Sequence, residues 1–248
     1  MKSTKLLATS LILAGGLLGA TSAKATADYE SATKVITNGQ VEFLENDEID
    51  DNIPDPENPE EPVEPEEPVN PNPGQLKINY VSAFNFGRQG NVSNRLTVNT
   101  VLDSLISRSG QEKKRVPFIA TEDRRGTERK GWELRVSQPN SFRDSADNEL
   151  AGATLTLNNL RYVNSVNAPT VTGGDIVLNS DEQVLAKADE TQGAGAWSLA
   201  LGNPTTEGTT DGVTLDIPAN TIKNVTTYST TLVWELIADP SANLPEEG

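Results

Sequence analysis

Short runs in which apolar and polar residues alternate dominate the chain from Gly74 onward. An alternation with a period of two places every second side chain on the same face of a strand. Clusters of Gly, Asn, Asp and Pro, which favour turns, separate these runs. The pattern predicts strands at Leu76–Tyr80, Val116–Thr121, Trp132–Gln138, Ala153–Asn158, Asp175–Leu178, Val184–Ala188, Trp197–Leu201, Val213–Ile217 and Thr230–Ile237.

Two of these runs alternate most clearly. In Trp132–Gln138 and in Thr230–Ile237, tryptophan and aliphatic residues recur at every second position, so each run has one apolar face. Only Thr97–Ser107 has apolar residues at helical spacing, and its β-branched residues weaken the helical alternative. The pattern therefore predicts an all-β body of sandwich or jelly-roll-like architecture.

The first 27 residues have the three parts of a secretory signal peptide. Two lysines precede an apolar run from Leu6 to Leu18, and small residues at spacing suited to cleavage follow. Cleavage is expected after Ala27, with Ala25 as the alternative. The apolar run is too short to cross a bilayer, and no later stretch is long enough. We predict a signal peptide at 1–27, secretion, and no membrane span in the mature form.

A short hairpin is predicted between the signal peptide and the main body. Asn38-Gly39 separates the alternating segments Lys34–Thr37 and Gln40–Phe43. This dipeptide readily adopts the positive φ angles of a two-residue turn. Because an isolated two-stranded hairpin is marginally stable in water, we expect the segment 28–53 to pair with the main body.

Composition excludes several classes of enzyme and metal site. The chain has no cysteine and no histidine, so it has no disulfide, thiolate nucleophile, histidine-ligated metal or Ser-His-Asp triad. Its net charge of −16 opposes binding to nucleic acids and to anionic membranes. Any enzyme built from this chain must therefore use carboxylates, lysine, tyrosine or backbone groups, and we expect no metal and no cofactor.

Most of the negative charge lies in one short stretch. Residues 28–73 carry fifteen acidic residues and a single lysine, whereas residues 74–248 have a net charge of only −5. Eight prolines fall within 54–73, interleaved with Glu and Asn. Because this segment has no apolar periodicity and repels itself, it is expected to be an extended linker before a domain at 74–248.

Each of the three tryptophans is followed two residues later by leucine. The triplets are Trp132-Glu133-Leu134, Trp197-Ser198-Leu199 and Trp234-Glu235-Leu236. In a strand, both large residues of a triplet face the same side. Such a pair either packs in a core or forms a binding face on which a sugar or polymer stacks, and composition favours the core.

Several segments occur in the order typical of one family. Asp123-Arg124-Arg125-Gly126 precedes Gly131-Trp132-Glu133-Leu134, and Tyr228–Leu236 precedes Asp239-Pro240. Together with the signal peptide and the acidic linker, they resemble the WxL-domain surface proteins of low-GC Gram-positive bacteria. Further similar segments are Gly74-Gln75-Leu76, Asn85-Phe86-Gly87 and Glu149–Leu155.

The resemblance implies a non-catalytic, extracellular protein that attaches non-covalently to the cell wall, with peptidoglycan as ligand. It also implies partners at the surface, namely WxL-interacting proteins and other WxL proteins. Trp197 lies outside the family's two motifs and is expected in the core. The family's motif residues correspond to Trp132, Leu134, Trp234 and Leu236.

Two further features concern attachment. The final segment, Leu244–Gly248, is similar to a sortase signal but has Glu247 in place of Thr, so covalent sorting is not expected. Residues 108–130 carry a net charge of +4, and guanidinium groups suit the phosphates and carboxylates of wall polymers. The alternatives are local ion pairs and a structural pairing of Arg124 with Asp123. The candidate polymer-binding residues are Arg124, Arg125, Arg129 and Lys130.

Two other functions are compatible with the same residues. The first is a structural or adhesive component that binds sibling surface proteins or host molecules, with the Trp-x-Leu strands as core. The second is a glycan hydrolase that uses carboxylates such as Glu133 and Glu235, although both alternate with the tryptophans and lie on the opposite, solvated face.

Overall fold

The computed structural model describes residues 27–37, 41–43 and 53–240. These residues form eighteen strands and no α-helix, which confirms the all-β prediction. None of them belongs to a helix long and apolar enough to cross a membrane. The predicted signal peptide sequence up to residue 26 and the segment Leu244–Gly248 lie outside the described residues. The chain divides into two compact units at residues 46 and 47.

The first unit contains a two-stranded antiparallel sheet. Its strands are β1 (Ala27–Ser31) and β2 (Lys34–Thr37), and they are joined by a two-residue turn. β2 begins at Lys34, as predicted. Its partner, however, is β1, which precedes it in the sequence, and not the predicted segment Gln40–Phe43, which follows it. Residues 41–43 form no strand, and 38–40 lie outside the described residues. An ion pair of 2.5 Å between Lys34 and Glu30 supports the observed pairing. Pairing of the hairpin with the main body stays a prediction.

The second unit consists of four antiparallel sheets of four strands each. The motif sheet has the order β13 (Thr170–Val171), β15 (Gln183–Ala188), β10 (Trp132–Ser137) and β18 (Val233–Ala238). The facing sheet has the order β14 (Ile176–Val177), β11 (Thr154–Leu157), β17 (Thr209–Ile217) and β6 (Leu96–Val101). The motif sheet therefore brings together strands about 100 residues apart in sequence.

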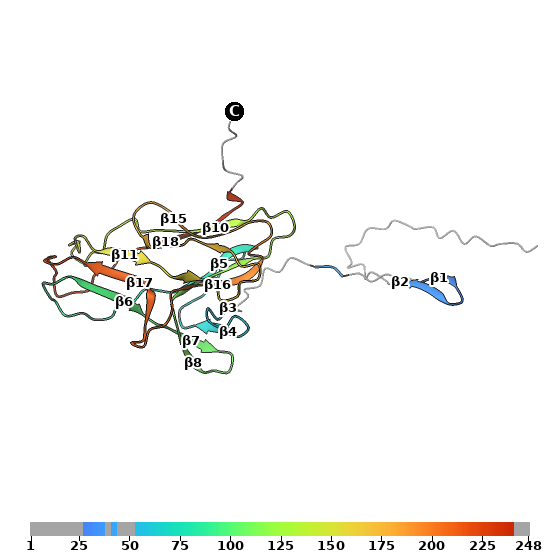
Figure 1. Ribbon diagram of the computed structural model, residues 1–248, viewed down its shortest axis with the longest axis horizontal. Coiled ribbons are helices and arrows are strands. Elements are labelled where there is room, and N and C mark those ends of the chain that lie inside the picture. Colours follow the sequence, from blue (N-terminus) through green and yellow to red (C-terminus); the bar gives the residue numbers. More distant parts are fainter. Residues whose placement is uncertain (1–26, 38–40, 44–52, 241–248) are drawn as a thin grey trace, which may run out of the picture. The chain divides into compact units, whose positions relative to one another are not determined.

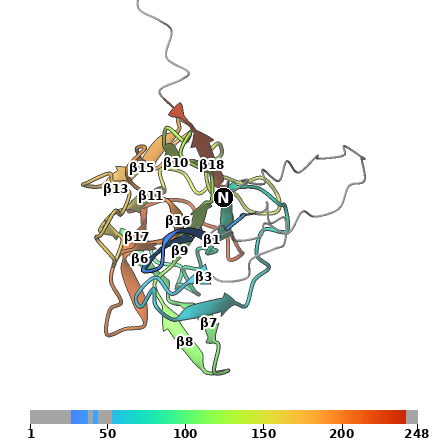
Figure 2. The same ribbon diagram turned by 90° about the vertical axis from the view of Figure 1, so that its right-hand side faces the viewer.

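The other two sheets complete the body. The central sheet has the order β12 (Leu160–Arg161), β16 (Gly195–Leu201), β9 (Phe118–Asp123) and β5 (Leu76–Val81). The Pro-rich sheet has the order β3 (Ile53–Pro54), β4 (Pro62–Pro65), β7 (Asp103–Ser107) and β8 (Glu112–Arg115). In both views the motif sheet lies at the top and β7 and β8 lie at the bottom (Figure 1, Figure 2).

The motif, facing and central sheets share one main core. Alternation along β10 is regular, because Trp132, Leu134 and Val136 are buried and the residues between them are half-buried. This is the pattern expected for a strand with one covered face. The facing and central sheets add leucines from β11, β16 and β17, and the main core thus joins three sheets. Its leucines from those strands are Leu155, Leu157, Leu199, Leu201 and Leu215.

A second core lies on the other face of the central sheet. All six residues of β9 are buried, so both of its faces are covered. Ile119 belongs to the main core, whereas its neighbours Phe118 and Ala120 belong to the second core. The Pro-rich sheet covers them with Ile53 and with side chains that include Val63 and Leu105. The central sheet is therefore enclosed between two layers.

The expectation of an extended linker at 54–73 is wrong for the strands of this segment. β4 pairs with β7, and Val63 in β4 is buried. The carboxylate of Asp55 is buried as well and forms a bidentate pair with Arg115 of β8, at 2.7 Å from Nε to Oδ1 and 2.8 Å from Nη2 to Oδ2. Packing and ion pairing thus hold the acidic segment against basic β8 instead of leaving it extended in solvent.

The strand arrangement also bears on three further expectations. Thr97–Ser107 forms β6 and β7 in two different sheets, so the helical alternative is wrong, in keeping with the strand preference of its β-branched residues. All nine predicted strands occur, with bounds shifted by a few residues. However, four small sheets replace the two large sheets of a sandwich, so that more specific architecture is not confirmed.

Candidate functional site

The two Trp-x-Leu motifs lie side by side in the motif sheet. β10 and β18 pair in an antiparallel register that places Leu134 opposite Leu236 and Val136 opposite Trp234. Trp132 faces Ala238 at the other end of the pair. The two leucines therefore meet in the middle of the strand pair, and the two tryptophans lie toward opposite ends.

The first motif is closed to solvent. Trp132 is 1 % exposed and Leu134 is 0 % exposed, and the Trp132 indole N–H donates a hydrogen bond of 3.2 Å to the Gly193 carbonyl oxygen. A side chain at Gly131, which has φ of 108°, would collide with the Ala188 carbonyl oxygen. A Cβ at Gly193 would lie only 3.1 Å from the Trp132 ring. Burial and the close approach of Gly193 thus enclose the tryptophan in the core, where it cannot contact a ligand.

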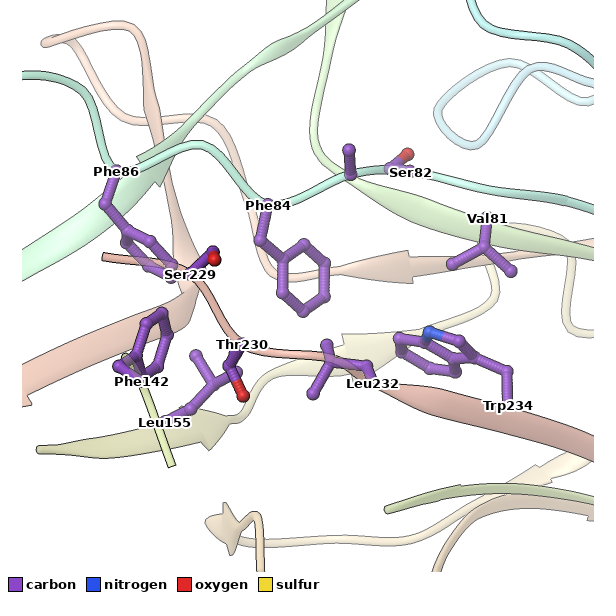
Figure 3. Close-up of a pocket in the computed structure, with 11 residues that line it drawn as sticks. Val81, Ser82, Phe84, Phe86, Phe142, Leu155, Ser229, Thr230, Leu232 and Trp234 are labelled. Atoms are coloured by element: carbon purple, nitrogen blue, oxygen red, sulfur yellow. The ribbon is translucent and has the colours of Figure 1, made fainter. Parts of the chain in front are cut away.

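The second motif is open by comparison. Trp234 is half-buried, and its ring meets that of Phe84 edge to face at 6.2 Å. Both rings border a hollow of about 410 Å³, together with Phe142 and Leu232 (Figure 3). Figure 3 shows Phe84 entering this hollow from one side and Leu232 and Trp234 from the other. Leu236 is half-buried against the main core. Of the four predicted motif residues, Trp234 alone borders this hollow.

Two neighbouring hollows extend this one. A hollow of about 660 Å³ shares Phe84, Phe86 and Phe142 with it, and a third of about 440 Å³ shares Val81 and Trp234. The three hollows therefore form a row with the 410 Å³ hollow in the middle. We call this row the aromatic groove, after its lining rings Phe84, Phe86, Phe142, Tyr228 and Trp234.

Sequence reasoning did not identify Phe84, Phe142 or Tyr228 as site residues. They lie in loops, where no regular alternation of apolar and polar residues singles them out. The signals available were the family-like segments Asn85-Phe86-Gly87 and Tyr228–Leu236, which the structure places around the same groove. Their adjacency depends on the pairing of distant strands.

Arg125 fastens the two motif segments together. Its guanidinium donates to the buried carboxylate of Asp123 (Nε to Oδ1, 2.9 Å), to Asp239 (Nη1 to Oδ1, 3.1 Å) and to the Gly131 carbonyl oxygen (2.7 Å). The hydrogen bond with Asp123 raises the pKa of Arg125 above its usual value. Asp239 in turn accepts a hydrogen bond of 2.8 Å from the Lys130 amide. One side chain therefore ties the segment before the first motif to the residue after the second.

The remaining candidates for polymer binding have internal contacts. Arg124 lies 3.5 Å from Glu122 and donates to the Gly74 carbonyl oxygen, and largely buried Arg129 donates to that of Gln192 at 2.6 Å. Arg125, and not Arg124, forms the structural pair with Asp123. These contacts favour the structural interpretation of the three arginines. Lys130 is exposed.

The other candidate residues lie outside the aromatic groove. Glu133 is paired with Arg135 at 2.6 Å, and Glu235 is exposed; neither borders any of the three hollows. Trp197 in β16 is half-buried against Tyr162, with ring centroids 5.6 Å apart.

Comparison with known proteins gives a family match. Neither a curated protein nor a solved structure matches the chain. A family model described as the WxL domain, surface cell wall-binding, matches residues 30–240. The match includes both motif strands, Arg125 with its two aspartates, and the aromatic groove. Since it spans most of the sequence, the chain belongs to the WxL family of surface cell wall-binding domains.

Proposed function

We propose that this chain is an exported, non-catalytic protein that attaches non-covalently to peptidoglycan through its WxL domain. The observation that carries the proposal is the unequal exposure of the two motifs, because Trp132 supports the fold while Trp234 borders a groove. Amino-sugar rings have apolar faces that stack on aromatic side chains, and mostly apolar concave sites with a few polar groups are typical of ligand binding. The signal-peptide pattern at 1–27 supports export.

A surface assembly is a second part of the proposal. β18 is an edge strand of the motif sheet, and its Val233 and Glu235 are exposed. Edge strands can pair with a strand of another chain. This favours contact with WxL-interacting proteins or other WxL proteins. It is compatible with the adhesive alternative, in which sibling or host proteins are the ligand, since the first motif is indeed core.

The test separates wall binding from stability of the fold. The wild-type chain and the variants Trp234→Ala, Trp132→Ala and Trp197→Ala are incubated with purified peptidoglycan freed of teichoic acid. The bound fraction and the thermal midpoint are measured for each. Trp234→Ala is expected to lose most of the bound fraction because its ring borders the groove.

The other two variants are the controls. Trp132→Ala is expected to lower the free energy of unfolding by about 3–5 kcal/mol because it leaves a cavity in the main core. Trp197→Ala removes a half-buried tryptophan that borders none of the three hollows, so it is expected to bind like the wild type. If the wild type did not bind peptidoglycan, the proposal would be contradicted. If it released soluble sugar fragments from peptidoglycan, the statement that the protein is non-catalytic would be contradicted.

A further inference from the structure

The 660 Å³ hollow of the aromatic groove has an unusual charge for this protein. The 660 Å³ hollow is bordered by Arg88 and Lys223 and by no carboxylate, although the chain has a net charge of −16. Arg88 is exposed and makes no ion pair or hydrogen bond with any described residue. The Lys223 ammonium donates to the Thr221 carbonyl oxygen at 3.1 Å. These cations are thus available to an anionic ligand, unlike Arg115 and Arg125.

The polar lining of the same hollow is held in place. The Asn91 side chain donates to the Lys223 carbonyl oxygen at 3.1 Å and so joins the two loops on either side. The Asn224 side chain donates to Asp144 at 2.9 Å. The hydrogen bond from Asn224 is the main cause that lowers the pKa of Asp144 to about 2, so the carboxylate that holds this loop is ionised at neutral pH. Amides and backbone groups therefore border the groove in a preorganised arrangement.

Aromatic rings complete the hollow. The rings of Phe86 and Phe142 meet edge to face, with centroids 6.4 Å apart. The hydroxyl of half-buried Tyr228 accepts a hydrogen bond of 2.8 Å from the backbone N–H of Asn224. The hollow shares three phenylalanines with the one that Trp234 borders, and that one shares Val81 and Trp234 with the third. A row of adjacent hollows suits an extended ligand better than a single small molecule.

We infer that the aromatic groove binds a glycan strand of peptidoglycan whose carboxylates pair with Arg88 and Lys223. The inference deepens the proposed function and rests on it. N-acetylated amino sugars stack their apolar faces on the rings, and their acetamido and hydroxyl groups bond to the amides. The carboxylates of the attached peptides supply the negative charge. Charge-assisted hydrogen bonds of guanidinium to carboxylate add both affinity and orientation.

The experiment compares the double variant Arg88→Gln/Lys223→Gln with the control Arg95→Gln. Arg95 is also an exposed arginine, but it is paired with Asp216 at 2.8 Å and borders none of the three hollows. Dissociation constants are measured on protease-treated peptidoglycan with and without its teichoic acid, and on stripped peptidoglycan whose carboxylates have been amidated. Thermal midpoints are recorded alongside.

The double variant is expected to bind stripped peptidoglycan about tenfold more weakly or worse, a loss of at least about 1.4 kcal/mol, because it lacks the charge-assisted hydrogen bonds to the carboxylates. The control is expected to match the wild type, amidation is expected to abolish the difference between them, and all thermal midpoints are expected to agree. Equal affinity of the double variant and the wild type would overturn the inference and leave the proposed function standing. If the wild type bound only walls that retain teichoic acid, Arg88 and Lys223 would pair with its phosphates and the inference of carboxylate binding would be wrong. If the wild type bound no wall preparation at all, both the inference and the proposed function would be wrong.

Discussion

At the scale of residues, the tripeptide Trp-Glu-Leu occurs in both motifs, but its tryptophan has a different environment in each. Trp132 lies on β10, which has a neighbour on each side, and the backbone at Gly193 lies close against its ring. Trp234 lies on β18, which is the edge of the sheet, and a hollow is left beside it. The different exposure of the two motif tryptophans therefore follows from the tertiary packing around each strand, and not from their own sequence neighbours.

Arg125 is expected to matter more for stability than its exposed neighbour Lys130. In Arg125→Gln, the carboxylate of Asp123, which is 0 % exposed, loses its bidentate partner and keeps only the longer contact with Arg129, at 3.7 Å from Nη1 to Oδ2. Removing one partner of a buried ion pair costs up to about 3–5 kcal/mol of unfolding free energy, and the contact with Arg129 offsets part of that cost. Lys130→Gln breaks a pair with Glu190 in which both side chains are largely exposed, and such pairs contribute less than about 1 kcal/mol. Urea denaturation of both variants measures the difference, and equal losses would refute this assignment.

At the scale of elements, the Pro-rich segment forms strands because its few apolar and acidic side chains find partners. Ile53 and Val63 are ten residues apart, too far for any local period to mark them, yet both are buried over β7 and β9. The acidic side chains meet basic β8, where Lys113 lies 2.6 Å from Glu61. Self-repulsion, the basis for expecting an extended linker, is therefore offset by cations from another element.

The pairing of Asp55 is expected to make this element sensitive to acid. Burial works to raise the pKa of Asp55, but hydrogen bonds from Arg115 and from the amides of Glu57 and Asn58 outweigh it. The pKa therefore lies below its ordinary value of 3.8. A lowered pKa means that the folded state binds fewer protons than the unfolded state. The stabilisation is thus complete above about pH 5 and is lost as the pH falls through the ordinary value toward the folded one.

Urea denaturation between about pH 7 and pH 3 checks this expectation. Asp55→Asn is the comparison, because it keeps the shape of the side chain and removes its titration. The variant is expected to be less stable than the wild type at pH 7, and the gap is expected to narrow below about pH 4. Parallel stability curves for the two proteins would show that Asp55 does not govern the acid response.

At the scale of the whole molecule, the second unit depends on cover from both sides of the central sheet. Phe118 and Leu105 are 0 % exposed and share a core with Ile53 of β3 and Val63 of β4. A boundary drawn at Gly74 therefore cuts through a core, although composition changes sharply there. The family match, which begins at residue 30, includes the covering strands.

A chain that begins at Gly74 is expected to be less stable than one that begins at Ile53. It lacks Ile53 and Val63, and each fully buried side chain of this kind contributes about 1.5–3 kcal/mol. The thermal midpoint is expected to fall by roughly 6–20 °C, with increased binding of a dye for exposed apolar surface. The two chains are compared by calorimetry, and equal midpoints would show that the segment is a removable linker after all.

Much of the element content could be predicted from sequence. The nine predicted strands follow from local alternation and turn residues, which act within a few positions of each other. The strands that were missed, such as β8, with four consecutive polar residues, and β4, with two prolines, have no such period. They form because strands distant in sequence pair with them, and local propensity cannot predict such pairing.

The sequence by itself determined the all-β class, the two motif strands with their apolar faces, and the family. Each of these depends on short-range order along the chain. The tertiary structure alone decided that Trp132 is sealed while Trp234 borders a groove, that Arg125 joins the motif segments, and that the Pro-rich segment belongs to the body. Burial and ion pairing depend on which distant residues become neighbours, and strand pairing across about 100 residues sets those neighbours.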